Sequence, residues 1–272
     1  MDLAYDEAGA GPAVVLIHGH PFNRSMWTPQ LTALADGYRV IAPDLRGYGD
    51  SPVTPGTVPM SLLAADVARL LDGLGVARAA LVGLSMGGLI AMELAIADPA
   101  RWWALGLVAT TAEPVTDAER SDRRARADQA EREGIRPLAE DMAARLFGPG
   151  VDPAVSQLIM TMMLASDPRG AAAALRGRAE RPDYRPLLRE LDLPALVAVG
   201  DQDSYSTAEI TDRLTASLRH PTRVTIPGIG HLPNLEDPAR FNAELTTFLE
   251  RYRPAEGERA TPPETGQRRS TT

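Results

Sequence analysis

The stretch Leu81-Val82-Gly83-Leu84-Ser85-Met86-Gly87-Gly88 decides the fold of this chain. The apolar run 79–82 predicts a short buried strand, and residues 86–97 have the composition of a helix. A glycine on each side of Ser85, two residues away, leaves room for a sharp turn from strand to helix. The turn would display the Ser85 hydroxyl at a helix N-terminus, where unpaired N–H groups and the helix dipole favour negative charge. Ser85 is therefore a candidate nucleophile, although a tight turn with an incidental serine would have the same sequence.

The composition fits one large α/β domain, or such a domain with an insertion. The chain has 272 residues, of which 44% are hydrophobic and 24% charged. Its formal net charge of -8 argues against nucleic acid or an anionic membrane as a partner. The absence of cysteine excludes disulfides, thiolate metal sites and cysteine nucleophiles, and the four histidines have no usual metal-ligand spacing. We expect neither a metal nor a cofactor.

The N-terminal region resembles no targeting segment. Residues 1–10 lack the basic and apolar parts of a signal peptide. No apolar run approaches the ~20 residues that span a bilayer. These features predict a cytoplasmic protein that does not insert into a membrane.

Predicted strands and helices alternate through the first 110 residues. Strands are expected at 3–8, 13–17, 38–42, 79–82 and 103–108, with helices at 25–35, 61–74 and 86–97. This alternation predicts a mostly parallel sheet with helices on both faces. Ligands of such sheets bind outside the carboxyl ends of the strands. Because His18, Asp44 and Ser85 each follow a predicted strand, we expect them to share one rim of the sheet.

The alternation stops after Thr110, and the stretch from Thr116 to about Glu190 has helical propensity only. An all-helical insertion between two strands of a sheet is a cap. The predicted division is an α/β core at 1–112 and 191–253, with a helical cap at 113–190. Residues 254–272 contain no large aliphatic or aromatic side chain and are rich in Pro, Thr, Glu and Arg, which predicts a disordered tail.

Two parts of the predicted cap differ in character. The charged run 117–133 is interpreted as a solvent-facing helix surface. The run 158–164 is apolar on nearly every side, so it is either core or the roof of an apolar pocket. On the second interpretation, candidate pocket residues are Met160, Met163 and Leu164, together with Phe22 from the loop after an early strand.

The second half of the sheet contributes an acid and a base to the candidate site. A serine hydroxyl becomes a strong nucleophile when a histidine takes its proton and a carboxylate holds that histidine in the right tautomer. Asp203 follows the predicted strand 195–199, and His231 follows the strand 223–226. The order Ser85, Asp203, His231 is the order in α/β-hydrolases, and it differs from that of two protease families.

Several alternatives accompany this assignment. Asp201 competes with Asp203 for the role of the acid, or it braces the loop, and Glu113 is the next candidate. His18 is expected to hydrogen-bond within its own loop. His220, which lies far from any motif, is expected at the surface.

An acyl-transfer site also needs hydrogen-bond donors for the oxyanion of its intermediate. One expected donor is the backbone N–H of Met86, the residue after the nucleophile. The other is the backbone N–H of His20, in the loop after the first buried strand. The imidazole of His20 is not expected to serve as the donor.

Together the motifs resemble those of the α/β-hydrolase fold superfamily, from about Leu3 to Arg251. They are His18-Gly19-His20-Pro21, the loop 44–51, Gly83-Leu84-Ser85-Met86-Gly87-Gly88, Gly200-Asp201-Gln202-Asp203 and Gly230-His231. The chain looks most like the small bacterial serine esterases, the haloperoxidase-like perhydrolases and the enol-lactonases. The resemblance implies a nucleophile at Ser85, an acid at Asp203, a base at His231 and oxyanion amides at His20 and Met86.

Two features depart from the usual pattern of the superfamily. The chain begins at what looks like its second strand, so an edge strand is in question. The nucleophile is serine, whereas haloalkane dehalogenases and epoxide hydrolases of this fold need aspartate. Hydrolases of carbon–carbon bonds usually have a more glycine-rich oxyanion loop and are disfavoured as well.

The sequence thus predicts a cofactor-free serine hydrolase that cleaves a small carboxylic ester or lactone through an acyl-enzyme. A small-molecule substrate is its expected partner. Perhydrolase, haloperoxidase-like or lyase activity on the same three residues is an alternative. A ligand-sensing protein of this fold with slow turnover is another.

Overall fold

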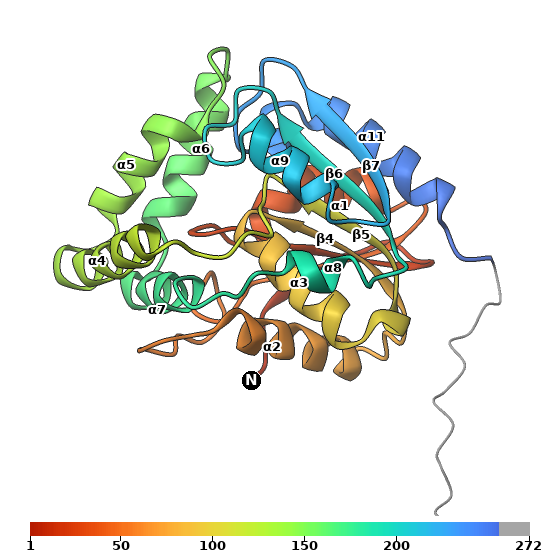
Figure 1. Cartoon of the computed structure of the whole chain (residues 1–272), viewed down its shortest axis with the longest axis horizontal. Helices are drawn as coiled ribbons and strands as arrows, with labels where there is room; N and C mark the ends of the chain where they lie inside the picture. The colour runs from red at the N-terminus through yellow and green to blue at the C-terminus, as the bar shows by residue number, and fades with distance from the viewer. Residues whose placement is uncertain (256–272) are drawn as a thin grey trace, which may run out of the picture.

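The computed structural model describes residues 1–255, which form a seven-stranded sheet flanked by helices (Figure 1). The strand order is β1-β3-β2-β4-β5-β6-β7, and every neighbouring pair is parallel except β1 with β3. The strands are β1 (Tyr5–Ala8), β2 (Ala13–Ile17), β3 (Arg39–Pro43), β4 (Ala79–Leu84), β5 (Trp102–Val108), β6 (Pro194–Gly200) and β7 (His220–Ile226). The predicted α/β fold is confirmed, and β1 supplies an antiparallel edge strand.

Helices cover both faces of the sheet because the central strands are apolar on both sides. In β2, Val15 and Ile17 join one buried cluster, while Val14 and Leu16 join another on the opposite face. The first face carries α2 (Met60–Gly73), α3 (Met86–Ala97), α8 (Arg185–Leu188) and part of α9 (Ala208–Thr215). The second carries the short 3₁₀ helix Arg24–Trp27, α1 (Thr28–Leu34), α10 (Pro233–Glu236) and α11 (Pro238–Arg251).

Further helices follow β5 and extend beyond the sheet, at the left of Figure 1. They are α4 (Asp117–Glu133), α5 (Arg136–Leu146), α6 (Pro153–Leu164) and α7 (Pro168–Arg178). A small buried cluster of their own, which includes Ala127, Leu138 and Ala171, holds α4, α5 and α7 together. In contrast, α6 packs Ile159, Met162 and Met163 into the cluster on the second face of the sheet. Of the run 158–164, interpreted from the sequence as core or pocket roof, the structure buries these three side chains in the core and leaves Leu158 exposed.

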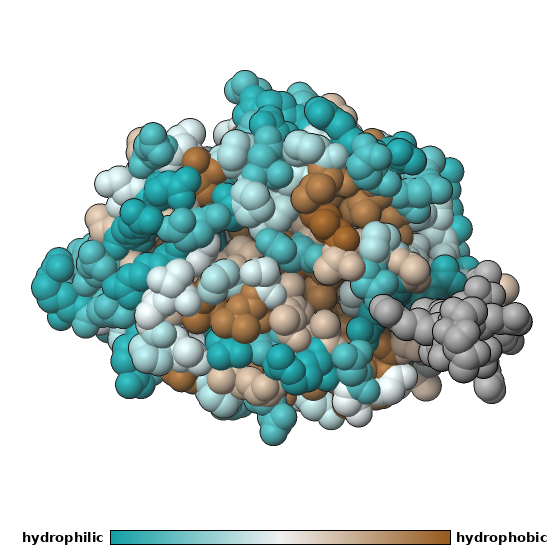
Figure 2. All heavy atoms as spheres, turned by 60° about the horizontal axis from the view of Figure 1, so that its bottom comes forward, coloured by the Kyte–Doolittle hydropathy of each residue, from teal (hydrophilic) through white to brown (hydrophobic). Residues whose placement is uncertain are grey.

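The surface of these helices is polar. In Figure 2 their side of the molecule, at the left, is mainly hydrophilic, and apolar patches lie nearer the middle and right. Within residues 1–255, no helix is both long and apolar enough to cross a membrane. The tail predicted for 254–272 lies almost entirely outside the described residues.

Candidate active site

Ser85 occupies a tight corner between β4 and α3. Its backbone angles are φ 54° and ψ -111°, a conformation that is uncommon for a residue with a side chain. The corner needs the flanking glycines, because a Cβ on Gly83 would lie 2.1 Å from the carbonyl oxygen of Gly87. A Cβ on Gly87 would in turn lie 2.1 Å from the carbonyl oxygen of Ile17. The turn expected from the sequence is therefore built from backbone packed directly on backbone.

The loop after β2 lies against this corner. A Cβ on Gly19 would be 3.3 Å from the Cβ of Ser85. The imidazole of His18, the residue before Gly19, is buried. Its Nδ1 lies 2.8 Å from the Gly19 carbonyl oxygen, and the backbone N–H of Leu45 donates a hydrogen bond to its Nε2 over 2.9 Å. Burial lowers the pKa of His18, so the ring is neutral and holds two loops together. As predicted, His18 hydrogen-bonds locally.

Two backbone N–H groups beside Ser85 have no hydrogen-bond acceptor within the described residues. One belongs to Met86, the first residue of α3, whose N–H has no partner inside the helix. The other belongs to His20. Both are therefore available to a ligand at Ser85.

Asp203 and His231 form a buried pair at the carboxyl ends of β6 and β7. The Asp203 Oδ2 lies 2.9 Å from the His231 Nδ1. The other carboxylate oxygen accepts hydrogen bonds from the backbone N–H groups of Tyr205 (2.8 Å) and Ser206 (3.0 Å). Burial acts to raise the pKa of Asp203, but His231 and these N–H groups outweigh it, and the pKa is below its ordinary value. An ionised Asp203 accepts a hydrogen bond from the Nδ1–H of His231, and the tautomer held in this way carries no proton on Nε2.

A carboxylate that the sequence analysis did not identify holds the His231 loop. Glu236 accepts hydrogen bonds from the backbone N–H groups of Gly230 and Leu232, both at 3.1 Å. It also accepts one at 2.8 Å from the N–H of Gly148, just after α5. The backbone N–H of His231 itself donates to the Leu146 carbonyl oxygen over 2.7 Å. The position of His231 thus depends on both the sheet and α5.

The alternative acids have other partners. Asp201 accepts a hydrogen bond from the Gly228 N–H over 2.7 Å and so braces the neighbouring loop. Glu113 is ion-paired with Arg213 at 2.6 Å. His220 is exposed, as expected, and lies 2.7 Å from Asp192.

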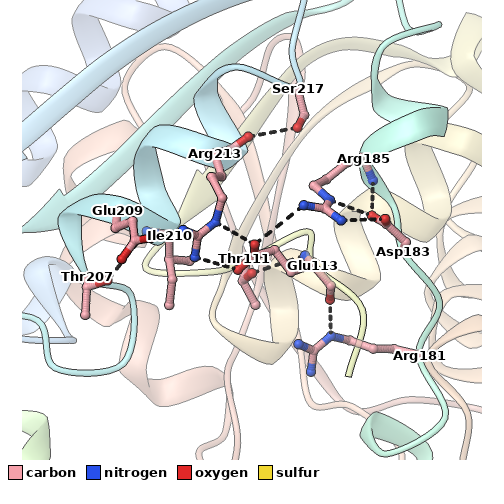
Figure 3. Close-up of polar contacts among 10 residues, drawn as sticks. All are labelled: Thr111, Glu113, Arg181, Asp183, Arg185, Thr207, Glu209, Ile210, Arg213 and Ser217. Carbon is pink, nitrogen blue, oxygen red and sulfur yellow. Dashed lines mark hydrogen bonds and ion pairs between the residues drawn. The ribbon is translucent and has the colours of Figure 1, made fainter. Parts of the chain in front are cut away.

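Two cavities open on Ser85 and His231. The larger has a volume of about 490 Å³ and lies between α3, the start of α4 and α9. Its rim carries the cluster in Figure 3, in which the Glu113 carboxylate faces Arg213 and Arg185. The backbone carbonyl of Glu113 accepts a hydrogen bond from the Nε of Arg181 over 3.1 Å.

The smaller cavity has a volume of about 260 Å³ and is roofed by α4, α5 and α7. Here α4, interpreted from the sequence as a solvent-facing helix, contributes Glu119, Asp122, Arg123 and Arg126. Other lining residues are His20, Tyr205 and Arg178. The roof over Ser85 is therefore rich in guanidinium groups, not purely apolar. Within residues 1–255, no cluster of three or more His, Cys, Asp or Glu side chains could hold a metal ion.

The profile of the alpha/beta hydrolase family matches residues 14–244. The chain belongs to this family. It is 32% identical to 3-oxoadipate enol-lactonase 2 of Acinetobacter baylyi over 259 residues, 93% of this chain and 95% of that protein. The enol-lactonase and a structurally similar esterase are hydrolases, and this protein is an α/β hydrolase enzyme.

Solved structures of the family superpose closely on this α/β hydrolase. A thermophilic esterase from Thermogutta terrifontis, with malate bound, has a TM-score of 0.90 at 39% identity, covering 92% of this chain and 93% of that one. The enol-lactonase of Burkholderia xenovorans has a TM-score of 0.85 at 30% identity, covering 91% and 96%. The likeness extends over both the sheet and the helices above it.

The apolar residues predicted to line the pocket of the α/β hydrolase line neither cavity at Ser85. Phe22 and Met163 are fully buried in the cluster on the second face of the sheet. Met160 and Leu164 are partly buried and pack against the same cluster. The composition of α6 does not show whether its apolar side chains pack on the sheet or line a pocket. Burying the same apolar area stabilises the fold by about as much in either place.

Proposed function

We propose that this α/β hydrolase cleaves a small carboxylic ester or lactone through an acyl-enzyme formed on Ser85. The observation that carries the proposal is the buried pair of Asp203 and His231, whose histidine lines both cavities that Ser85 lines. In this assignment Ser85 is the nucleophile, His231 the general base and Asp203 the acid that orients it. The proposed division into an α/β core at 1–112 and 191–253 and a cap at 113–190 puts the substrate between them.

The chemistry follows from the hydrogen bond between Asp203 and His231. The Nε2 of His231 takes the proton of the Ser85 hydroxyl while its oxygen bonds to the substrate carbonyl carbon. The tetrahedral intermediate then expels the alcohol oxygen, which receives the same proton from His231. A water molecule repeats the sequence on the acyl-enzyme: its proton goes to His231, its oxygen to the acyl carbon, and Ser85 recovers its hydrogen. Asp203 stabilises the imidazolium formed in each half.

The proposed oxyanion site consists of the backbone N–H groups of His20 and Met86. Met86 follows Ser85 in the chain, His20 lines the smaller cavity together with Ser85, and neither N–H has another acceptor within residues 1–255. Such donors stabilise charge that develops on the carbonyl oxygen in the transition state. Relatives that are named as an enol-lactonase and an esterase support a small ester or lactone as the substrate class.

A fluorophosphonate probe and steady-state hydrolysis of short-chain esters test the proposal together. The wild-type protein should react with the probe and hydrolyse the esters. Ser85→Ala should not react with the probe, and its kcat should be lower by up to about 10⁶-fold, the scale seen for a protease nucleophile. Ser61→Ala is the matched control, because Ser61 is an exposed serine on α2. Equal labelling of Ser85→Ala and wild type would overturn the assignment of the nucleophile.

A further inference from the structure

The cavities at Ser85 are cationic in a protein that is acidic overall. The chain has a formal net charge of -8. The two cavities are nevertheless lined by seven arginines and only three carboxylates. The arginines are Arg123, Arg126, Arg145, Arg178, Arg181, Arg185 and Arg213, and the carboxylates are Glu113, Glu119 and Asp122. An excess of positive charge around a reaction site needs a cause.

Five of these arginines have carboxylate partners, and in four of them the partners account for the charge. The four pairs are Arg126 with Asp141 (2.5 Å), Arg145 with Asp141 (3.0 Å), Arg185 with Asp183 (2.7 Å) and Arg213 with Glu113 (2.6 Å). Two of these pairs join separate elements: Arg126–Asp141 joins α4 to α5, and Arg213–Glu113 joins α9 to the loop after β5. The four pairs leave little capacity for a ligand. The fifth arginine, Arg123, is paired with Glu119 at 3.3 Å but keeps a buried Nη1 without a partner.

Arg178 is different, because its guanidinium has no hydrogen bond or ion pair with any described residue. Its Nε is inaccessible and unpartnered. Burial lowers the pKa of Arg178 to about 9, and the nearby charges of Arg123 and Arg181 act in the same direction. Arg178 is partly exposed on the cavity side, while its Nε is enclosed. A partly buried cation without a counter-charge is unfavourable for the fold, and this guanidinium is free to pair with an anion that enters the cavity.

Three more polar atoms on the smaller cavity are buried without a partner in the described residues. They are the Nη1 of Arg123, the hydroxyl of Tyr205 and the Nε2 of His20. The His20 Nδ1 lies 2.7 Å from the Tyr48 hydroxyl. When that hydroxyl donates to Nδ1, the neutral ring carries its proton on Nε2, facing the cavity as a donor. Buried donors are normally satisfied, and these four gather around one space.

We propose that this space binds a free carboxylate of the substrate, so that the enzyme prefers esters or lactones that carry a second, ionised carboxyl group. Arg178 is the central donor, with Arg123 and the His20 Nε2–H beside it. A planar guanidinium matches a carboxylate with charge-assisted hydrogen bonds. The inference rests on the proposed function for the reaction, but not for the binding of the anion.

The position of Arg178 is rigid. It ends α7, and a Cβ on the preceding Gly177 would lie 1.7 Å from the Val58 carbonyl oxygen. At the start of α7, a Cβ on Gly170 would lie 2.0 Å from the Gly47 carbonyl oxygen. Direct backbone contact at both ends fixes α7 on the core. Arg178 is therefore preorganised to orient one end of a substrate whose other end reacts at Ser85.

Paired substrates test the preference. Monomethyl glutarate and methyl pentanoate are similar in shape, and only the first carries a carboxylate near neutral pH. Wild type should have the higher kcat/KM for monomethyl glutarate. Arg178→Met should lower the ratio of the two values roughly 10- to 150-fold, the scale of a hydrogen bond to a charged group. Arg178→Lys should restore part of the ratio. Arg132→Met, which removes an exposed arginine of α4, should leave it unchanged.

Binding to the Ser85→Ala protein tests the anion site without turnover. Calorimetry should detect glutarate binding to this protein, and glutarate should raise its Tm. When Arg178→Met is added to Ser85→Ala, the affinity for glutarate should fall by at least about 10-fold. Without glutarate, Arg178→Met should keep or raise the Tm, since an unpaired charge is removed.

Three outcomes would overturn the proposal: equal kcat/KM ratios in wild type and Arg178→Met, no binding of glutarate, or binding of inorganic phosphate as tight as that of glutarate. If the wild-type protein neither reacted with the fluorophosphonate probe nor hydrolysed any ester, the proposed function would be contradicted instead. The measurement of glutarate binding would still decide whether the anion site exists.

Discussion

The carboxylate of Asp203 lies 2.9 Å from the Nδ1 of His231, while the carboxylate of Asp201 is hydrogen-bonded to the backbone of Gly228. The two aspartates follow the same strand, two residues apart, and have separate tasks. Asp203 reaches the buried ring, and Asp201 braces a loop. Asp201 and Asp203 can therefore be compared directly, because one carboxylate contacts the histidine and the other only the backbone of a loop.

Asp203→Asn should nearly abolish ester turnover and leave the fold intact. The amide keeps the shape of the side chain but no longer favours the tautomer of His231 with a free Nε2, and in a protease this change cost about 10⁴-fold. Asp201→Asn should keep most of the activity, because an amide oxygen can still accept from Gly228. Turnover and Tm of both variants are the measurements. An inactive Asp201→Asn with unchanged Tm would reverse the two roles.

Gly87→Ala should destabilise the protein by several kcal/mol, if it folds, because its methyl group would lie 2.1 Å from the Ile17 carbonyl oxygen. Gly73→Ala is the matched control, since Gly73 ends α2 and its added methyl group would meet nothing within 4 Å. That change should stabilise the helix by up to about 1 kcal/mol. Urea unfolding measures both, and similar midpoints for the two variants would contradict the backbone packing at Ser85.

Met163→Ala should lower the free energy of unfolding by about 2–5 kcal/mol, the range for truncating a fully buried side chain. Leu158→Ala on the same helix should change it by less than about 0.5 kcal/mol, because Leu158 is 51% exposed. Neither should shift the preference between short and long acyl chains, since neither residue lines the cavities at Ser85. A changed preference in Met163→Ala with little loss of stability would return this residue to the pocket.

The fold and the positions of Ser85, Asp203 and His231 could be predicted because local signals define them. Each follows an apolar run that forms a strand, and parallel strands bring their carboxyl ends to one edge. The sequence favours Asp203 over Asp201 as the acid but leaves Asp201 as an alternative. Which of them reaches the ring depends on two backbone N–H groups, from Tyr205 and Ser206, that hold the Asp203 side chain.

The residues that line the roof of the site could not be predicted from the sequence. They depend on how α4, α5 and α7 pack on one another, and no local motif sets that packing. The charges of α4 look like a solvent-facing surface, yet Arg123 and Glu119 reach the cavities. The apolar side chains of α6 could line a pocket or pack in a core, and in the structure the buried ones pack against the sheet. Arg178 had no distinguishing signal in the sequence. Only its missing partner in the structure marks it.

The last prediction concerns the two buried histidines beside Ser85. His18 and His20 are 0% and 2% exposed. Burial is the largest cause that lowers the pKa of each, and the pKa of His20 is well below its ordinary value, helped by the nearby charge of Arg178. In the unfolded chain both rings should protonate near pH ~6.5. The folded protein should therefore bind fewer protons than the unfolded chain just below that pH.

It follows that the free energy of unfolding should fall as the pH drops from about 6.5 toward the folded-state pKa values. Each histidine adds a slope of up to about 1.4 kcal/mol per pH unit. His20→Gln should remove the contribution of His20, so its stability should fall less steeply than that of wild type. Tyr48→Phe is the control, because it deletes the hydrogen bond to His20 but keeps the buried ring. It should lower stability and retain most of the slope. Urea unfolding at several pH values between about 7 and 5 measures these slopes, and equal slopes for wild type and His20→Gln would mean that the folded protein protonates His20 as readily as the unfolded chain does.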